Sequence, residues 1–77
     1  MPRITFEDVI WHPTFISLMD ALRRQDAKPR LAGGLVTRGW TSHDIDILVS
    51  HNVTVPIECL QLRIKGRWWP VSILTKP

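Results

Sequence analysis

Residues 31–50 read LAGGLVTRGWTSHDIDILVS, and the rest of the chain can be interpreted from this segment. The side chains of a strand alternate between its two faces. In a strand over residues 43–49, Asp44 and Asp46 therefore share one face, and the apolar residues that alternate with them share the other. The pattern predicts a strand that is anionic at the start of one face and buried on the opposite face.

Two adjacent glycines, Gly33 and Gly34, precede these acids. Because glycine has no Cβ, such a pair lets the backbone approach a polyphosphate closely and turn its N–H groups toward one anion. Asp44 and Asp46 would lie about 7 Å apart along a strand that rises ~3.3 Å per residue. Carboxylates so placed can share Mg²⁺, which takes oxygen ligands and keeps bound waters that a phosphate can replace.

The combination resembles the DNA polymerase beta-like nucleotidyltransferase superfamily. Its signature is a Gly-Gly or Gly-Ser pair, followed at an interval by an acid-apolar-acid motif on a strand. Arg38 and Ser42, which lie between the glycines and the acids, look like the family's Arg-Gly turn and its small polar approach to the acids. The strong part of the resemblance covers about twenty residues.

The resemblance implies transfer of a nucleoside monophosphate from a nucleoside triphosphate to a hydroxyl, with Mg²⁺ or Mn²⁺ as cofactor. The acceptor would be nucleic acid, a protein side chain or a small molecule. The implied metal ligands and catalytic residues are Asp44 and Asp46, and the implied nucleotide-binding residues are Gly33, Gly34, Arg38 and Ser42.

A third carboxylate on a neighbouring strand usually completes the family's site. Glu58 is the only acid after Asp46 in the sequence, so it is the candidate for this catalytic position. Its connection to Asp46 is shorter than the family's. The alternative is that Glu58 is an exposed residue at the end of a strand.

Length and composition bound the fold class. The 77 residues suffice for a single domain over 1–77, and 44% hydrophobic with 22% charged residues is typical of a folded globule. The single cysteine, Cys59, excludes an internal disulfide and favours a reducing, cytoplasmic location. No apolar run is long enough for a membrane span, so no membrane partner is expected.

The predicted fold is α+β, with one or two N-terminal helices packed on a small mixed, mostly antiparallel sheet of about four strands, as in a reduced nucleotidyltransferase core. Thr5 is expected to cap a short first helix, and Thr14 a second helix over 14–25. A strand over 30–35 is expected to pair antiparallel with the acidic strand, because the connection is too short for a helical crossover.

The C-terminal third is predicted to form a hairpin. A strand ends at Ile64, Lys65 and Gly66 make a two-residue turn, and the return strand runs over 67–74. Pro70 lacks a backbone N–H, which favours an edge position for the return strand.

The tryptophans give three further predictions. Trp68 and Trp69 are adjacent in a strand and must face opposite sides, and Trp11 is expected in the core. Cations cluster after Glu58, and together with exposed tryptophan they favour a polyanionic partner such as nucleic acid. A solvated basic surface is the alternative.

Two other functions stay open. The chain could be a non-catalytic relative that serves as a binding module, for example an antitoxin-like partner or a subunit, and it could form a homo-oligomer or need a partner subunit to complete the site. It could also be a basic nucleic-acid-binding domain that uses the C-terminal hairpin. Steeply salt-dependent binding that survives Asp44→Asn would indicate the last function.

Overall fold

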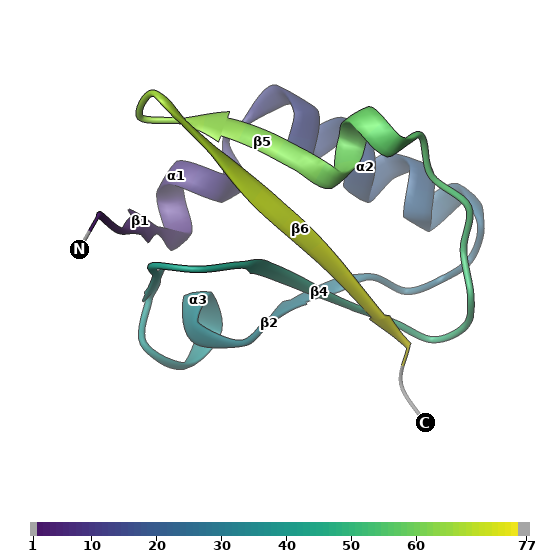
Figure 1. Cartoon of the computed structure of the whole chain (residues 1–77). Helices are drawn as coiled ribbons and strands as arrows, with labels where there is room; N and C mark the ends of the chain where they lie inside the picture. Colours follow the sequence, from purple (N-terminus) through teal and green to yellow (C-terminus); the bar gives the residue numbers. More distant parts are fainter. Residues whose placement is uncertain (1, 76–77) are drawn as a thin grey trace.

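The structure, a computed structural model, describes residues 2–75 and has the predicted α+β class (Figure 1). Its larger sheet has the strand order β2 (Arg30–Ala32), β4 (Ile45–Val49), β6 (Arg67–Thr75), β5 (Gln61–Ile64). The β2–β4 and β5–β6 pairs are antiparallel and the β4–β6 pair is parallel, so the sheet is mixed. The predicted antiparallel pairing of the strands on either side of the glycines is confirmed.

Helices α1 (Phe6–Ile10) and α2 (Pro13–Arg24) lie on one side of this sheet (Figure 1). Helix α2 buries Phe15, Leu18, Met19 and Leu22, the apolar face that the helical spacing predicts. These side chains form one core with the alternate residues of β4, including Ile45 and Ile47. The core therefore covers one face of β4 and leaves the face of Asp46 outside it.

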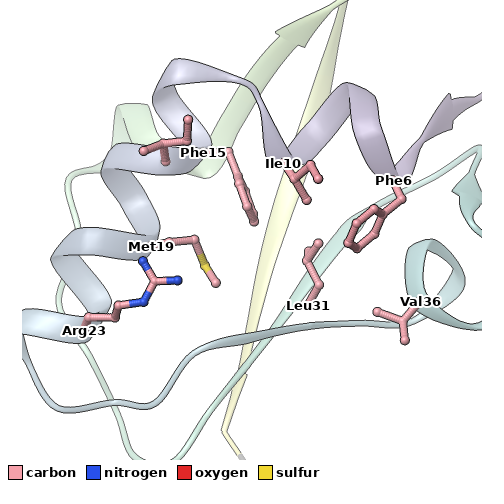
Figure 2. Close-up of a pocket in the computed structure, with 8 residues that line it drawn as sticks. Phe6, Ile10, Phe15, Met19, Arg23, Leu31 and Val36 are labelled. Atoms are coloured by element: carbon pink, nitrogen blue, oxygen red, sulfur yellow. The ribbon is translucent and has the colours of Figure 1, made fainter.

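A cavity of about 430 Å³ opens between the two helices, β2 and the segment after it (Figure 2). Its lining is apolar except for one arginine at the end of α2: Phe6, Ile10, Phe15, Ile16, Met19, Arg23, Leu31 and Val36. Neither Asp44 nor Asp46 belongs to this lining.

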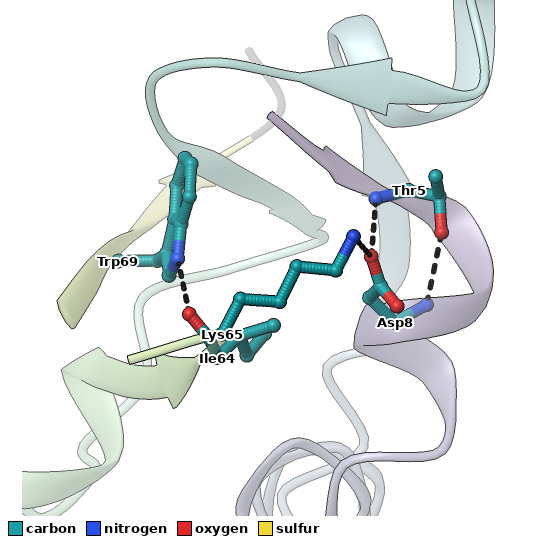
Figure 3. A network of polar contacts seen from close by, with 5 residues as sticks. All are labelled: Thr5, Asp8, Ile64, Lys65 and Trp69. Atoms are coloured by element: carbon teal, nitrogen blue, oxygen red, sulfur yellow. Dashed lines mark hydrogen bonds and ion pairs between the residues drawn. The ribbon is translucent and has the colours of Figure 1, made fainter. Parts of the chain in front are cut away.

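The cap of α1 is the one that the sequence predicts. Thr5 Oγ1 accepts a hydrogen bond from the Asp8 backbone N–H (3.3 Å), and the Thr5 N–H donates to Asp8 Oδ2 (2.9 Å). Lys65 Nζ, in the hairpin turn, lies 3.2 Å from the same carboxylate (Figure 3). The hydrogen bond from the Thr5 N–H lowers the pKa of Asp8, so this carboxylate stays charged and ties α1 to the hairpin.

The prediction that Thr14 caps α2 is wrong, because the helix begins two residues earlier than expected. The N-cap is His12, whose Nδ1 accepts a hydrogen bond from the Thr14 N–H (3.1 Å), and Pro13 occupies the first helical position. Proline fits there because its missing N–H would have no partner inside the helix. His12 Nε2 also lies 3.0 Å from the Arg63 carbonyl oxygen, which joins the start of α2 to β5.

The predicted hairpin is present, but β6 is not an edge strand. Lys65 and Gly66 form the turn with φ of 53° and 76°. Strand β6 lies between β4 and β5, contrary to the prediction from Pro70. Pairing with β4 begins only at Val71, so the residue that lacks an N–H lies just before the parallel ladder starts.

The tryptophans divide as predicted in β6 and differently in the N-terminal region. Trp69 is 2% exposed and its Nε1 donates to the Ile64 carbonyl oxygen (3.1 Å; Figure 3), whereas Trp68 is 57% exposed. Trp11 is 71% exposed, so the prediction that it belongs to the core is wrong. It is the C-cap of α1, where the chain turns toward α2 instead of continuing the apolar face.

The segment after β2 is more ordered than the sequence indicates. Strand β2 ends at Ala32, a short helix α3 (Gly34–Thr37) follows, and β3 (Trp40–Thr41) pairs antiparallel with β1 (Ile4–Thr5). The expected strand over 30–35 is therefore wrong in its second half. Four-residue helices and two-residue strands lack a periodic sequence pattern, which explains why none was predicted.

Residues 50–60 lead from β4 back to the hairpin without a long helix. They end in the 3-10 turn η1 (Ile57–Leu60), which places Glu58 in this turn and not in a strand. Within residues 2–75, no helix combines the length and the apolar character that crossing a bilayer requires.

Candidate metal and phosphate site

Asp44 and Asp46 lie on the side of β4 that faces away from the core. Asp46 is half-buried in the strand, and Asp44 is exposed just before it, whereas Ile45 and Ile47 are fully buried. Burial raises the pKa of Asp46, and the negative charge of Asp44 raises it further. The alternation that the sequence predicts is therefore present, and the two carboxylates are close enough to interact.

The glycine bend contacts this acidic pair directly. The β2–β4 ladder pairs Ala32 with Asp46, so Gly33 follows immediately beside that carboxylate. A Cβ added at Gly33 would overlap Asp46 Oδ2 and lie 3.2 Å from its Cγ. Gly33 also has φ of 69° and ψ of −152°, a conformation essentially restricted to glycine. Both the backbone shape and the approach of the carboxylate require glycine at this position.

Gly34 has the corresponding contact with Arg38. Gly34 is the first residue of α3 and Arg38 caps its C-terminus, and a Cβ added at Gly34 would overlap the Arg38 guanidinium. That guanidinium lies over the Trp40 ring, with its Cζ 4.5 Å from the ring centroid. Helix α3 therefore places Arg38, the predicted phosphate-binding arginine, in contact with Gly34.

The other two predicted residues lie at different places. Ser42 is half-buried in the turn between β3 and β4, two residues before Asp44. Glu58 is exposed in η1. Among residues 2–75, no three His, Cys, Asp or Glu side chains gather closely enough to hold a metal ion, so Glu58 does not form such a group with the two aspartates.

Ser72 takes the position next to the acids on the neighbouring strand. It is the register partner of Asp46 across the parallel β4–β6 pair, and its Oγ donates a hydrogen bond to Asp44 Oδ2 (3.1 Å). The sequence does not reveal this residue, because a serine 26 positions after Asp46 carries no signal until the strand order is known. The neighbour of the two aspartates on β6 is thus a hydroxyl and not a third carboxylate.

The donor set suits a hard divalent cation. It consists of two carboxylates from β4 and the residue before it and one hydroxyl from the neighbouring β6, and Mg²⁺ and Mn²⁺ prefer oxygen ligands and retain waters where protein ligands are few. Within the described residues 2–75, neither aspartate forms an ion pair with a lysine or arginine. A bound cation would also relieve the repulsion that raises the pKa of Asp46.

Comparisons of the chain with models of known protein families, with curated proteins and with solved structures found no match. The nucleotidyltransferase resemblance of residues 31–50 thus stays a prediction from the residues themselves. The contact between Gly33 and Asp46 is a structural observation that is independent of it.

Proposed function

We propose that the protein binds a nucleoside triphosphate with Mg²⁺ or Mn²⁺ and transfers the nucleoside monophosphate to a hydroxyl acceptor. The observation that carries this proposal is the Asp46 carboxylate packed against Gly33, where the Cβ of any other residue would overlap that carboxylate. A phosphate chain at that bend would lie beside both aspartates. Arg38, folded against Gly34, would be in reach of the same phosphates.

Each residue has a defined part in the proposed reaction. Asp44 and Asp46 hold the metal, the glycine bend admits the phosphates, and Arg38 offsets their charge. When bound, divalent ions polarise the α-phosphate and lower the pKa of the attacking hydroxyl. The acceptor oxygen bonds to the α-phosphorus, the α–β bridging P–O bond breaks, pyrophosphate leaves, and the hydroxyl proton passes to solvent.

The proposal is tested by titrating the protein with Mn²⁺ and a non-hydrolysable nucleoside triphosphate in a calorimeter. Wild type is expected to bind the pair, and Asp44→Asn to bind it at least tenfold more weakly because a metal ligand is lost. Asp20→Asn is the matched control, since Asp20 is an exposed acid on α2 that pairs with Arg23. Equal binding by Asp44→Asn and Asp20→Asn would contradict the proposed site.

Ser72 favours a second candidate function, a non-catalytic module that binds a metal–nucleotide complex. A serine beside the aspartates can position one of them, as its hydrogen bond to Asp44 does, but it cannot act as a carboxylate ligand or base. Incubation with a hydrolysable triphosphate and Mn²⁺ separates the two functions. Pyrophosphate release that depends on Asp44 supports the transferase, whereas tight binding without release supports the module.

Installing the missing acid extends this test. Ser72→Asp would place a third carboxylate opposite Asp46. If the site is a catalytic centre that lacks only this ligand, the variant should release pyrophosphate faster than wild type. If it releases none while still binding Mn²⁺, the binding module is favoured.

A further inference from the structure

The short β1–β3 ladder brings the N-terminal segment to the candidate site. It pairs Thr5 with Trp40, and the Phe6 N–H donates to the Gly39 carbonyl oxygen (2.9 Å). Arg3 precedes this ladder, and its guanidinium carbon lies 4.1 Å from the centroid of the Trp40 ring. A residue distant in sequence thus reaches the turn that carries the phosphate-binding candidates.

Two guanidinium groups converge on this one indole. Arg38 Cζ is 4.5 Å from the same centroid, and Arg38 also lies against Gly34. Each cation is attracted to the ring by its quadrupole, which holds the two arginines in place although their charges repel. Among residues 2–75 the ion pairs involve other cations, so no carboxylate of that part of the chain neutralises Arg3 or Arg38.

We propose that Arg3, Trp40 and Arg38, here called the arginine cluster, form a second half of the site that binds the phosphates beyond the reacting one. The inference rests on the proposed function, and it assigns the β- and γ-phosphates of the nucleoside triphosphate to the arginine cluster. Arg3 is the residue that it adds, with Trp40 as the positioning residue between the two cations.

The chemistry of the two halves is complementary. The aspartates suit metal-bound oxygens at the α-phosphate, and their own charge disfavours any further uncompensated phosphate. Arginine presents a planar fork of donors that matches phosphate oxygens, and both arginines are exposed. A bound polyphosphate would replace the repulsion between the two guanidinium groups with attraction to each.

The test compares affinities for a non-hydrolysable nucleoside triphosphate and for the monophosphate of the same base, both with Mn²⁺. Arg3→Gln is expected to weaken triphosphate binding about tenfold, as for loss of one charged hydrogen bond, and to change monophosphate binding less than about twofold. The matched control is Arg63→Gln, because Arg63 likewise lies over a tryptophan ring, with its Cζ 5.4 Å from the Trp68 centroid, but in the hairpin. It should change neither affinity by more than about twofold.

The outcomes separate this inference from the proposed function. The role of the arginine cluster would be overturned if Arg3→Gln and Arg63→Gln lost the same affinity for the triphosphate, or if Arg3→Gln lost the same affinity for both ligands. In either case, binding of the triphosphate by wild type would still support the site at the aspartates. Failure of wild type to bind the triphosphate would overturn both. If Arg3→Gln proves unfolded by circular dichroism, Arg3→Lys, which keeps the charge but loses the planar fork, carries the comparison with the same outcomes.

Discussion

Gly33 combines a backbone conformation restricted to glycine with direct contact to Asp46, a candidate metal ligand. We expect Gly33→Ala to destabilise the fold by about 2–3 kcal/mol, because its φ and ψ are strained for any other residue and its new Cβ would meet the Asp46 carboxylate. It should also weaken binding of Mn²⁺ with a triphosphate more than tenfold. Urea denaturation and calorimetry measure the two effects.

The control for this substitution is Gly66→Ala in the hairpin turn. Gly66 has φ of 76°, but no heavy atom lies within 4 Å of an added Cβ. Gly66→Ala should therefore lower the free energy of unfolding by the backbone strain alone, about 1–2 kcal/mol, and should leave metal and nucleotide binding unchanged. If both variants bind equally well, the bend at Gly33 has no part in the site.

Asp46 carries the second prediction at this scale. Its pKa is raised above the usual 3.8 in the folded state by burial and by Asp44. The folded protein therefore binds more protons than the unfolded chain in that range, and the contribution of Asp46 to stability falls as the pH rises through the raised pKa. At neutral pH the ionised Asp46 carboxylate therefore lowers the stability of the folded protein.

We therefore expect Asp46→Asn to raise the stability of the metal-free protein at pH 7 by on the order of 0.5 kcal/mol, the size typical of partly exposed positions. The difference from wild type should vanish at acidic pH, below the usual Asp pKa. Mn²⁺ should stabilise wild type and leave the variant unchanged. Urea denaturation at several pH values, with and without Mn²⁺, measures each effect, and a variant less stable than wild type at pH 7 would contradict the argument.

Single residues of the site differ in how far the sequence predicts them. The alternation of Asp44 and Asp46 is a local property of a strand, so it could be predicted. Strand pairings between segments distant in sequence bring Ser72 to the two aspartates and Arg3 to Trp40, and no spacing rule reveals such neighbours.

At the scale of elements, the loop after β4 is held against the end of α2 by hydrogen bonds. Gln25 Nε2 donates to the Thr54 carbonyl oxygen (2.8 Å) and the Ser50 N–H donates to that of Ala27 (2.8 Å). His51 Nδ1 lies 3.0 Å from the Asn52 carbonyl oxygen, and its Nε2 lies 3.2 Å from that of Asp26. These contacts compensate for the absence of regular structure in residues 50–56.

His51 makes this loop sensitive to pH. The Asn52 carbonyl oxygen, followed by that of Asp26, raises the pKa of the imidazole above 6.5, because the protonated ring can donate to both. Its contribution to stability is fully present below pH 6.5 and is lost as the pH rises through the raised pKa. We expect wild type to lose Tm relative to His51→Gln over that interval.

Thermal denaturation of both proteins between pH 5.5 and 8.5 checks the prediction. His43→Gln is the control, since His43 is exposed in the turn before β4 and uses its backbone N–H, not its ring, to bond Thr41. A pH-independent difference between wild type and His51→Gln would show that the ring contributes only as a neutral group.

Elements with strong local signals were predicted, and those fixed by distant contacts were not. The apolar spacing of α2 and the Lys65–Gly66 turn each identify an element within a few residues. The β1–β3 ladder joins two-residue strands that are far apart in the chain, and its stability comes from tertiary context. The interior position of β6 likewise depends on strand order, which Pro70 alone predicted incorrectly.

For the whole molecule, the small size of the core limits how much free energy of unfolding a core substitution can remove before the protein unfolds. We expect Trp69→Ala to cost about 3–5 kcal/mol, since the buried indole and its hydrogen bond to Ile64 are both lost. A domain of this size has roughly that much stability in total, so the variant should be largely unfolded by circular dichroism. Trp68→Ala should cost no more than about 1 kcal/mol, mainly its contact with Arg63. Similar melting curves for the two variants would contradict the assignment of Trp69 to the core.

The interior position of β6 has a consequence for how the protein is made. Both β4 and β5 use β6 as their partner, and β6 is synthesised after them. Until β6 is available, one side of β4 and all of β5 lack their partner, and unpaired strand edges are sites for chaperone capture or aggregation. Folding of this domain is thus expected to follow translation of its final strand rather than to proceed stepwise from the N-terminus.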